Sequence, residues 1–165
     1  MTRSASANCL FSTALATAEA ITMAGARVVF VDIDPKTYNI DVRAIEANIT
    51  PKTKAIIPVH MRGVPARMDE IMAVARKHDL IVVEDVAQSN GASYKGRLLG
   101  TFGQVGCFSF QQYKIITSGE GGLLDLRCPE TVAPEFLERF FDGDRLTVRP
   151  VGGHGVKGVG DAEDA

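Results

Sequence analysis

Short apolar segments that alternate with helical patterns constrain the fold of this chain most strongly. Apolar and β-branched residues dominate residues 27–33, 55–59 and 80–83, which is typical of strands. Between these segments, apolar residues recur at the three- and four-residue spacing of a helix face. Strands that alternate with helices in this way predict an α/β fold with a mainly parallel sheet and flanking helices.

Local signals place the helices and the remaining strands. Residues 15–24 are expected to form a helix that Gly25 ends, and Asp41 is expected to cap a second, short helix. Because residues 27–33 are almost continuously apolar, this strand is expected to be buried on both faces. Two further strands are predicted at residues 106–110 and 122–126, around a glycine-rich turn.

Length and charge limit the classes of partner. The chain has 165 residues and a net charge of −2, with basic and acidic residues spread along it. A nucleic-acid or polybasic membrane partner requires clustered Lys and Arg, so neither is expected. No stretch approaches the roughly 18 consecutive apolar residues that span a bilayer.

Three widely spaced cysteines, Cys9, Cys107 and Cys128, provide neither a disulfide framework nor zinc-like spacing. We expect reduced thiols, a cytoplasmic protein and no metal site.

Polar residues follow the predicted strand at 80–83, where ligands bind in open parallel sheets. Asp85 lies there, and Gln88 follows three residues later. Alone, Asp85 is more often a helix cap or a metal ligand than a residue that faces a bound cation, and both interpretations stay open. His60, after another strand, either faces a substrate or is a hydrogen-bonded structural residue, and the second interpretation is favoured.

A second cluster surrounds Lys114. Ser109 ends a buried strand, Lys114 follows five residues later, and glycines at 119, 121 and 122 allow a tight turn. A lone lysine is usually a solvated surface cation, and spacing alone favours that interpretation. A lysine behind an apolar strand and before a glycine turn is also a candidate for a desolvated amine, and the neutral amine is the form that forms a Schiff base.

Several of these segments together resemble one protein family. The segments are "AGARVVFVDIDPKTYNID" (24–41), "PVHMRG" (58–63), "VEDVAQSNGASYKG" (83–96) and "SFQQYKIITSGEGG" (109–122). They are similar to the DegT/StrS-type sugar aminotransferases, which are pyridoxal-phosphate (PLP) enzymes of the aspartate-aminotransferase fold, fold type I. The last segment is especially similar to enzymes that aminate keto-cyclitols in aminoglycoside pathways.

The resemblance implies a role for four residues. Lys114 matches the lysine that holds PLP and acts in catalysis, and Asp85 matches the carboxylate that pairs with the pyridinium nitrogen. Gln88 matches the residue that meets the phenolic oxygen of the cofactor, and Ser109 matches a phosphate-binding hydroxyl. Because lysine occupies position 114, transamination is favoured over the dehydration chemistry of relatives with histidine there.

The implied reaction moves an amino group from Glu or Gln to a keto-sugar or keto-cyclitol, in an enzyme that is a homodimer in the full-length family. Residues 1–126 are expected to form part of the PLP-binding large domain, and residues 127–165 a divergent, poorly ordered tail. The family's N-terminal phosphate-binding turn and its small C-terminal domain have no match in the sequence. The alternative is therefore a catalytically inactive, truncated remnant of such an enzyme.

Overall fold

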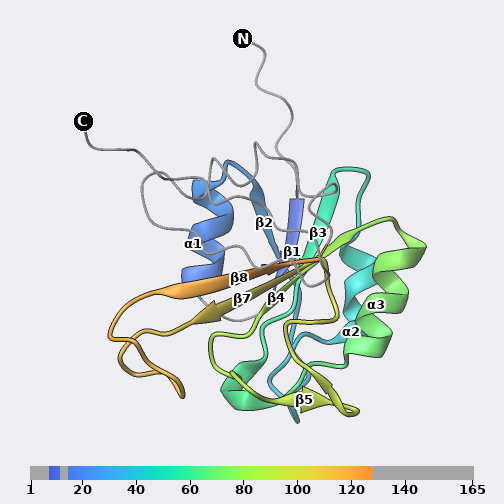
Figure 1. The fold of residues 1–165 in the computed structure, drawn as a ribbon. Coiled ribbons are helices and arrows are strands. Elements are labelled where there is room, and N and C mark those ends of the chain that lie inside the picture. Colours follow the sequence, from blue (N-terminus) through green and yellow to red (C-terminus); the bar gives the residue numbers. More distant parts are fainter. Residues whose placement is uncertain (1–7, 12–14, 128–165) are drawn as a thin grey trace.

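A six-stranded sheet with helices on both faces organises the computed structural model, which describes residues 8–11 and 15–127 (Figure 1). The strand order is β2–β1–β3–β4–β7–β8. The strands are β1 (Asn8–Phe11), β2 (Arg27–Phe30), β3 (Thr53–Ile57), β4 (Ile81–Asp85), β7 (Val105–Ser109) and β8 (Gly122–Leu126). All neighbouring pairs are parallel except β7 and β8, which form an antiparallel hairpin.

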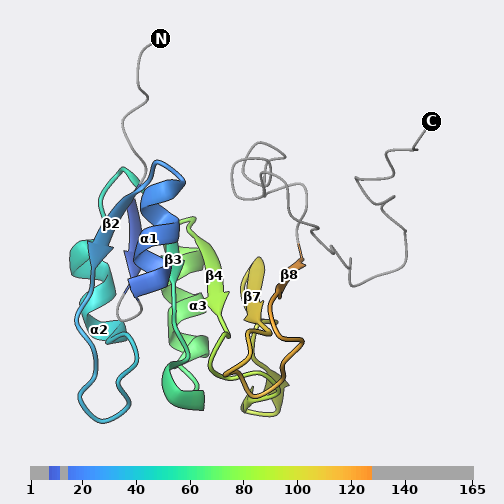
Figure 2. The same cartoon turned by 90° about the vertical axis from the view of Figure 1, so that its left-hand side faces the viewer.

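Helices cover the two faces of the sheet unequally. Helix α1 (Leu15–Met23) lies on one face, and α2 (Val42–Ile45) and α3 (Met68–Lys77) lie on the other (Figures 1 and 2). Two single-turn 3₁₀ helices, η1 (Glu46–Asn48) and η2 (Met61–Gly63), and a small hairpin of β5 (Ser93–Tyr94) and β6 (Arg97–Leu98) complete the fold.

The core follows this division into two faces. Val82 of β4 packs with α2 and α3 in the larger apolar cluster, which also contains Val86. Val83, the next residue of β4, packs with Ile21 of α1 in the smaller cluster on the opposite face. This is the alternation of a pleated strand, so each residue of β4 can be assigned to one face.

The predicted helices are confirmed, because their signals are local. Helix α1 ends two residues before Gly25, which has the positive φ of a C-terminal cap. The Asp41 carboxylate accepts a hydrogen bond from the backbone N–H of Arg43 at the start of α2. Helix α3 begins with acidic residues and ends with basic ones, as its dipole favours.

The expectation that residues 27–33 form a strand buried on both faces is wrong. Strand β2 covers only residues 27–30 and lies at the edge of the sheet, where the Phe30 side chain is 66% exposed. The strand that pairs with β2 inside the sheet is β1, which the sequence did not predict. Local apolar character does not encode the order of strands, so it did not reveal that β2 is an edge strand.

The described residues bear on some of the other expectations. Cys9 and Cys107 are free thiols. Cys128 and the predicted tail from residue 128 onward lie outside the described residues. No helix in residues 8–11 and 15–127 combines the length and apolar character needed to cross a membrane.

Candidate active site at the carboxyl edge of the sheet

Asp85 is the last residue of β4 and lies at the carboxyl edge of the sheet. Its Oδ2 accepts a hydrogen bond from the Thr17 hydroxyl of α1 at 2.6 Å, and its Oδ1 accepts one from the Ala87 backbone N–H at 3.1 Å. A carboxylate can accept about four hydrogen bonds, so both oxygens keep accepting capacity. Since the next element is β5, the alternative that Asp85 caps a helix is wrong.

Ser109 lies at the same edge and on the same face as Asp85. In the parallel pairing of β4 with β7, Asp85 is opposite Cys107, and Ser109 follows two residues later at the end of β7. Residues two apart in a strand project to the same face, so the Asp85 and Ser109 side chains share the face that α1 covers. Among the described residues, the Ser109 hydroxyl accepts one long hydrogen bond, 3.4 Å, from the Gln111 N–H and donates its own proton to none of them.

Gln88 is held with a fixed orientation in the loop after β4. Its Oε1 accepts a hydrogen bond from the Arg62 backbone N–H at 3.0 Å. Because that partner is a donor, the oxygen must face it and the amide Nε2 must point away. The Nε2 group makes no hydrogen bond with any described residue, so Gln88 presents two free donor hydrogens.

Two hydrogen bonds to backbone carbonyls of β7 join this loop to the strand. The Val86 N–H donates to the Cys107 carbonyl at 2.8 Å, and the Asn90 side-chain amide donates to the Ser109 carbonyl at 2.9 Å. These two bonds flank Gln88 in the sequence and keep it beside the end of β7.

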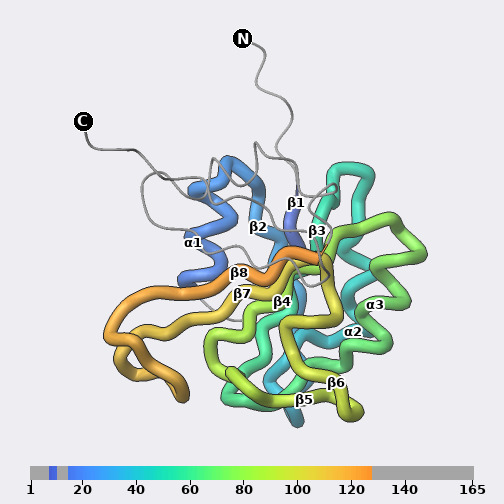
Figure 3. Tube along the Cα trace, viewed as in Figure 1, coloured from blue at the N-terminus to red at the C-terminus, as the bar shows by residue number. Residues whose placement is uncertain are grey.

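Lys114 lies in the loop between β7 and β8, which projects beyond the sheet (Figure 3). Its backbone N–H donates to the Gln111 carbonyl at 2.9 Å, and a Phe110-to-Gly121 hydrogen bond closes the base of the loop. The Lys114 side chain is half-buried, whereas its neighbour Tyr113 is 85% exposed. In the part of the chain that the structure describes, no hydrogen bond or ion pair joins Lys114 to the other three predicted site residues, so its convergence with Asp85 stays a prediction.

A buried carboxylate beside Asp85 was missed by the sequence analysis. Glu84 is fully buried, and its oxygens accept hydrogen bonds from the backbone N–H groups of Gly100, Phe102 and Gly103 at 2.6–2.8 Å. They also accept one from Nε2 of His60 at 3.3 Å. The available signals were the charge inside an apolar strand and the glycines of "GTFGQVG".

His60 is therefore a structural residue, as the favoured interpretation predicted. Its ring is fully buried, and Nδ1 accepts a hydrogen bond from the Ala66 N–H, which leaves the proton on Nε2 for donation to Glu84. Burial alone would raise the pKa of Glu84, but hydrogen bonds from His60, Gly103 and Gly100 outweigh burial and hold that pKa below its usual value.

The surroundings of Cys107 keep its thiol in the protonated, unreactive form. Burial raises its pKa to about 12, and the nearby charges of Asp85 and Glu84 add to this rise. A thiolate next to these carboxylates would be strongly disfavoured, so Cys107 is not a candidate nucleophile.

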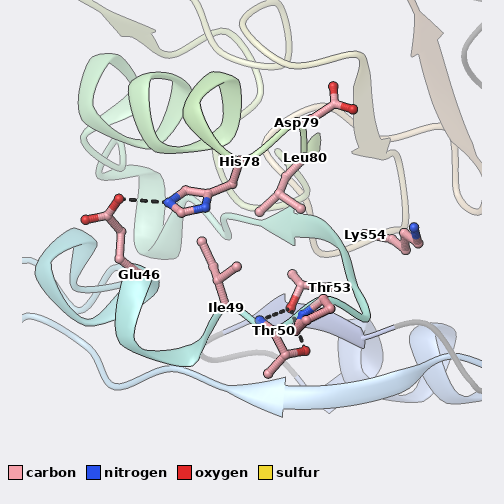
Figure 4. Close-up of a pocket in the computed structure, with 9 residues that line it drawn as sticks. Glu46, Ile49, Thr50, Thr53, Lys54, His78, Asp79 and Leu80 are labelled. Carbon is pink, nitrogen blue, oxygen red and sulfur yellow. Dashed lines mark hydrogen bonds and ion pairs between the residues drawn. The ribbon is translucent and has the colours of Figure 1, made fainter.

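A surface depression lies at the opposite end of the strands, where β3 and β4 begin (Figure 4). Glu46 and His78 face each other across part of it, and the Glu46 carboxylate accepts hydrogen bonds from both His78 and Lys77. His78 lies directly after the end of α3, and its ring is held there by the contact with Glu46. Glu46 is engaged with Lys77 and His78, and none of the four predicted site residues lines the depression, so we keep the carboxyl edge as the candidate site.

Metal ligation finds no support in the described residues. No group of three His, Cys, Asp or Glu side chains within them is placed to hold a metal ion.

The model of the DegT/DnrJ/EryC1/StrS aminotransferase family matches residues 11–136. This chain belongs to that family. The matched segment contains all four predicted site residues and nearly all of the described fold. The predicted fold class, part of the large domain of a fold type I enzyme with a mainly parallel sheet and flanking helices, is confirmed.

Two curated relatives of this DegT-family chain have names that refer to different compounds, GDP-perosamine and 2-deoxy-scyllo-inosose. GDP-perosamine synthase of Caulobacter vibrioides is 50% identical over 112 residues, which is 68% of this chain and 30% of the relative. L-glutamine:2-deoxy-scyllo-inosose aminotransferase of Streptomyces kanamyceticus is 47% identical over 108 residues, 66% of this chain and 25% of the relative. The chain thus spans less than a third of the length of either relative.

A solved structure extends the similarity to three dimensions. The PLP-form of the Streptococcus pneumoniae protein Spr1654 superposes with a TM-score of 0.67 at 32% sequence identity. The superposition covers 70% of this chain and 34% of the Spr1654 chain.

Proposed function

We propose that this chain is part of a PLP-dependent aminotransferase that transfers an amino group from Glu or Gln to a keto-sugar or keto-cyclitol. The observation that carries the proposal is the set of unused polar groups at the carboxyl edge of the sheet. The PLP-form of the Streptococcus pneumoniae protein supports the cofactor, and the names of the two curated relatives support the acceptor class.

The unused groups have the polarities that PLP requires. Asp85 has accepting capacity for the N–H of a protonated pyridine ring, and Gln88 has a free amide donor for a phenolic oxygen. Ser109 has a hydroxyl proton to donate to a phosphate oxygen. Lys114 has an amine with no described partner. One acceptor, two neutral donors and one amine fit the four functional parts of this cofactor.

Each residue has a distinct role in this proposal. Asp85 would hold the proton on the ring nitrogen, because a partly buried carboxylate stabilises the positive charge of that group. Gln88 and Ser109 orient the ring and the phosphate. Lys114 would hold the cofactor through Nζ, and its amine would serve as the acid–base group that moves the proton at the reacting carbon. When bound, PLP supplies the electron sink for the bond that breaks at the amino-acid α-carbon.

The proposal includes an assembly and a compartment. We place the full-length enzyme in the cytoplasm, as a homodimer. Exposed apolar side chains on α1, with Met23 88% exposed and Leu15 76% exposed, support a further covering surface on this face. The free thiols of Cys9 and Cys107 support a reducing compartment.

PLP titration of the purified chain tests the cofactor assignment. We expect a saturable absorbance change in the wild type and, after borohydride reduction, a PLP adduct that mass spectrometry locates on Lys114. The Lys114→Ala variant should lose the adduct. Lys54→Ala is the matched control. Lys54 is an exposed lysine near the start of β3, at the end of the strands opposite the candidate site. A wild type without saturable binding, or an adduct that persists in Lys114→Ala, contradicts the proposal.

Amino transfer is tested separately by adding glutamate or glutamine to the PLP-loaded chain. Release of the corresponding 2-oxo acid is the expected result. Cofactor binding without release of the 2-oxo acid would instead support the alternative of a catalytically inactive remnant.

A further inference from the structure

We propose that Thr17 is a positioning residue that sets the orientation of the Asp85 carboxylate toward the ring nitrogen of the cofactor. The inference rests on the proposed function and adds a residue from α1 to the site. It concerns a contact between two elements that are 68 residues apart in the sequence.

The Thr17–Asp85 hydrogen bond is short and directed at one oxygen. The distance between Thr17 Oγ1 and Asp85 Oδ2 is 2.6 Å, within the range for a hydroxyl bound to an ionised carboxylate. The backbone N–H of Ala87 is bound to the other oxygen, Oδ1. With one donor on each oxygen, the carboxylate plane is fixed and rotation about the last side-chain bond would break both contacts.

The Thr17–Asp85 hydrogen bond differs from the other side-chain hydrogen bond of α1. The helix has the sequence LATAEAITM, and its apolar residues are distributed around the helix axis rather than confined to one face. Its other threonine, Thr22, donates its hydroxyl to the Ala18 carbonyl one turn earlier, a bond within the helix. Among the described residues, Thr17 makes the one side-chain hydrogen bond from α1 to the sheet.

The unoccupied lone pairs of the Asp85 carboxylate indicate the role of this orientation. Because Thr17 and Ala87 each occupy one lone-pair direction, each oxygen keeps a direction that no described residue occupies. A ring N–H must approach along one of these free directions. A carboxylate without the Thr17 bond could rotate, and ordering it again would reduce the affinity for the ring.

Three variants isolate the hydroxyl. Thr17→Val keeps the shape of the side chain and removes the hydroxyl, whereas Thr17→Ser keeps the hydroxyl and removes a methyl group. Thr22→Val makes the same chemical change on the same helix, away from Asp85. A hydrogen bond to a charged group has a strength that corresponds to about a tenfold change in affinity. We therefore expect Thr17→Val to weaken PLP binding on the order of tenfold, and Thr17→Ser and Thr22→Val to bind like the wild type.

A cofactor analogue separates positioning from general support of the fold. In this analogue a C–H group replaces the ring nitrogen, so that Asp85 has no N–H to accept. If Thr17 acts through Asp85, the wild type and Thr17→Val should bind the analogue equally, since the two changes remove the same interaction. If the hydroxyl only supports the fold, Thr17→Val should weaken the binding of PLP and of the analogue by the same factor.

Each outcome has one meaning. A wild type that binds no PLP overturns the proposed function, and the Thr17 inference with it. A wild type that binds PLP while Thr17→Val binds it equally well overturns the Thr17 inference alone, as does an equal loss for both ligands. Far-UV circular dichroism checks the fold of each variant, and Thr17→Ala, which favours the helix, replaces Thr17→Val should the latter unfold.

Discussion

Replacement of Glu84 by glutamine should be severely destabilising, although the two side chains have nearly the same shape. In the wild type, one carboxylate oxygen accepts from Phe102 and Gly103, and the other accepts from Gly100 and His60. A glutamine amide has one accepting oxygen and one NH2 donor. In either orientation the NH2 group faces two N–H donors, so two hydrogen bonds are lost and buried donors are left unpaired.

The magnitude follows from these contacts. An unpaired buried polar group costs about 1–3 kcal/mol, and removal of one partner from a buried charge network costs about 3–5 kcal/mol. We expect Glu84→Gln to lower the free energy of unfolding by about 4 kcal/mol, against a typical total of about 5–15 kcal/mol. With an m-value of about 2 kcal/mol/M, the urea midpoint should fall by about 2 M.

Urea denaturation followed by circular dichroism measures this change. The matched control is Glu46→Gln, because Glu46 is an exposed glutamate whose carboxylate pairs with Lys77 and His78 at the surface. The control should keep the wild-type midpoint. A Glu84→Gln midpoint equal to that of the control would refute the view that the Glu84 carboxylate organises this part of the fold.

The pH dependence provides a second check on Glu84. Since the pKa of Glu84 in the folded chain lies below the ordinary value of 4.5, its stabilising contribution is present above pH 4.5 and is lost as the pH falls through the folded value. The stability difference between the wild type and Glu84→Gln should therefore shrink below about pH 4.5.

Two further predictions concern other parts of the fold. Hydrogen bonds from Lys95 and Tyr94 lower the pKa of Asp69 from 3.8 to about 2, so its stabilising contribution is present above pH 3.8 and is lost as the pH falls toward 2. Asp69→Asn should flatten acid unfolding in that interval, and an unchanged acid limb would contradict the assignment. A Cβ on Gly103 would lie 2.4 Å from a carbonyl oxygen of β4. One on Gly91 would meet nothing within 4 Å, so that its cost is the backbone strain of the positive φ of 81° there. Gly103→Ala should therefore lower the melting temperature well below that of Gly91→Ala, and equal melting temperatures would contradict the predicted backbone clash.

The sequence predicted those elements whose signals are local. Helix α3 has its apolar spacing, its acidic start and its basic end within ten residues. Strand β4 is apolar and β-branched and ends in the polar residues of the site. By contrast, β1 has only four residues, and its pairing with β2 and β3 depends on contacts far along the chain. Strand order arises from such non-local pairing, so neither the position of β1 nor the edge position of β2 could be predicted from local patterns.

The same limit applies to the candidate site. Asp85, Gln88 and Ser109 could be singled out because they follow strands that end at one edge of the sheet, and the family resemblance assigned them roles. Thr17 gave no such signal, because its partner is on a distant strand. Contacts between a covering helix and a strand end are formed by tertiary packing, and no spacing rule in one sequence identifies them.

Two adjacent carboxylates, Glu84 and Asp85, show how the pleat of one strand divides structural from chemical roles. Because successive side chains of a strand project to opposite faces, Glu84 follows Val82 into the face of α2 and α3, and Asp85 follows Val83 toward α1. Glu84 meets four donors and has its accepting capacity filled, so its charge is used to fix the backbone around it. Within the described part of the chain, Asp85 meets two donors and keeps lone pairs at the edge where a ligand can approach. A shift of one residue in the register of β4 would exchange the two faces, with the saturated carboxylate at the site and the unsaturated one in the core. The hydrogen bonds that saturate Glu84 therefore also fix the register that presents Asp85 to the candidate site.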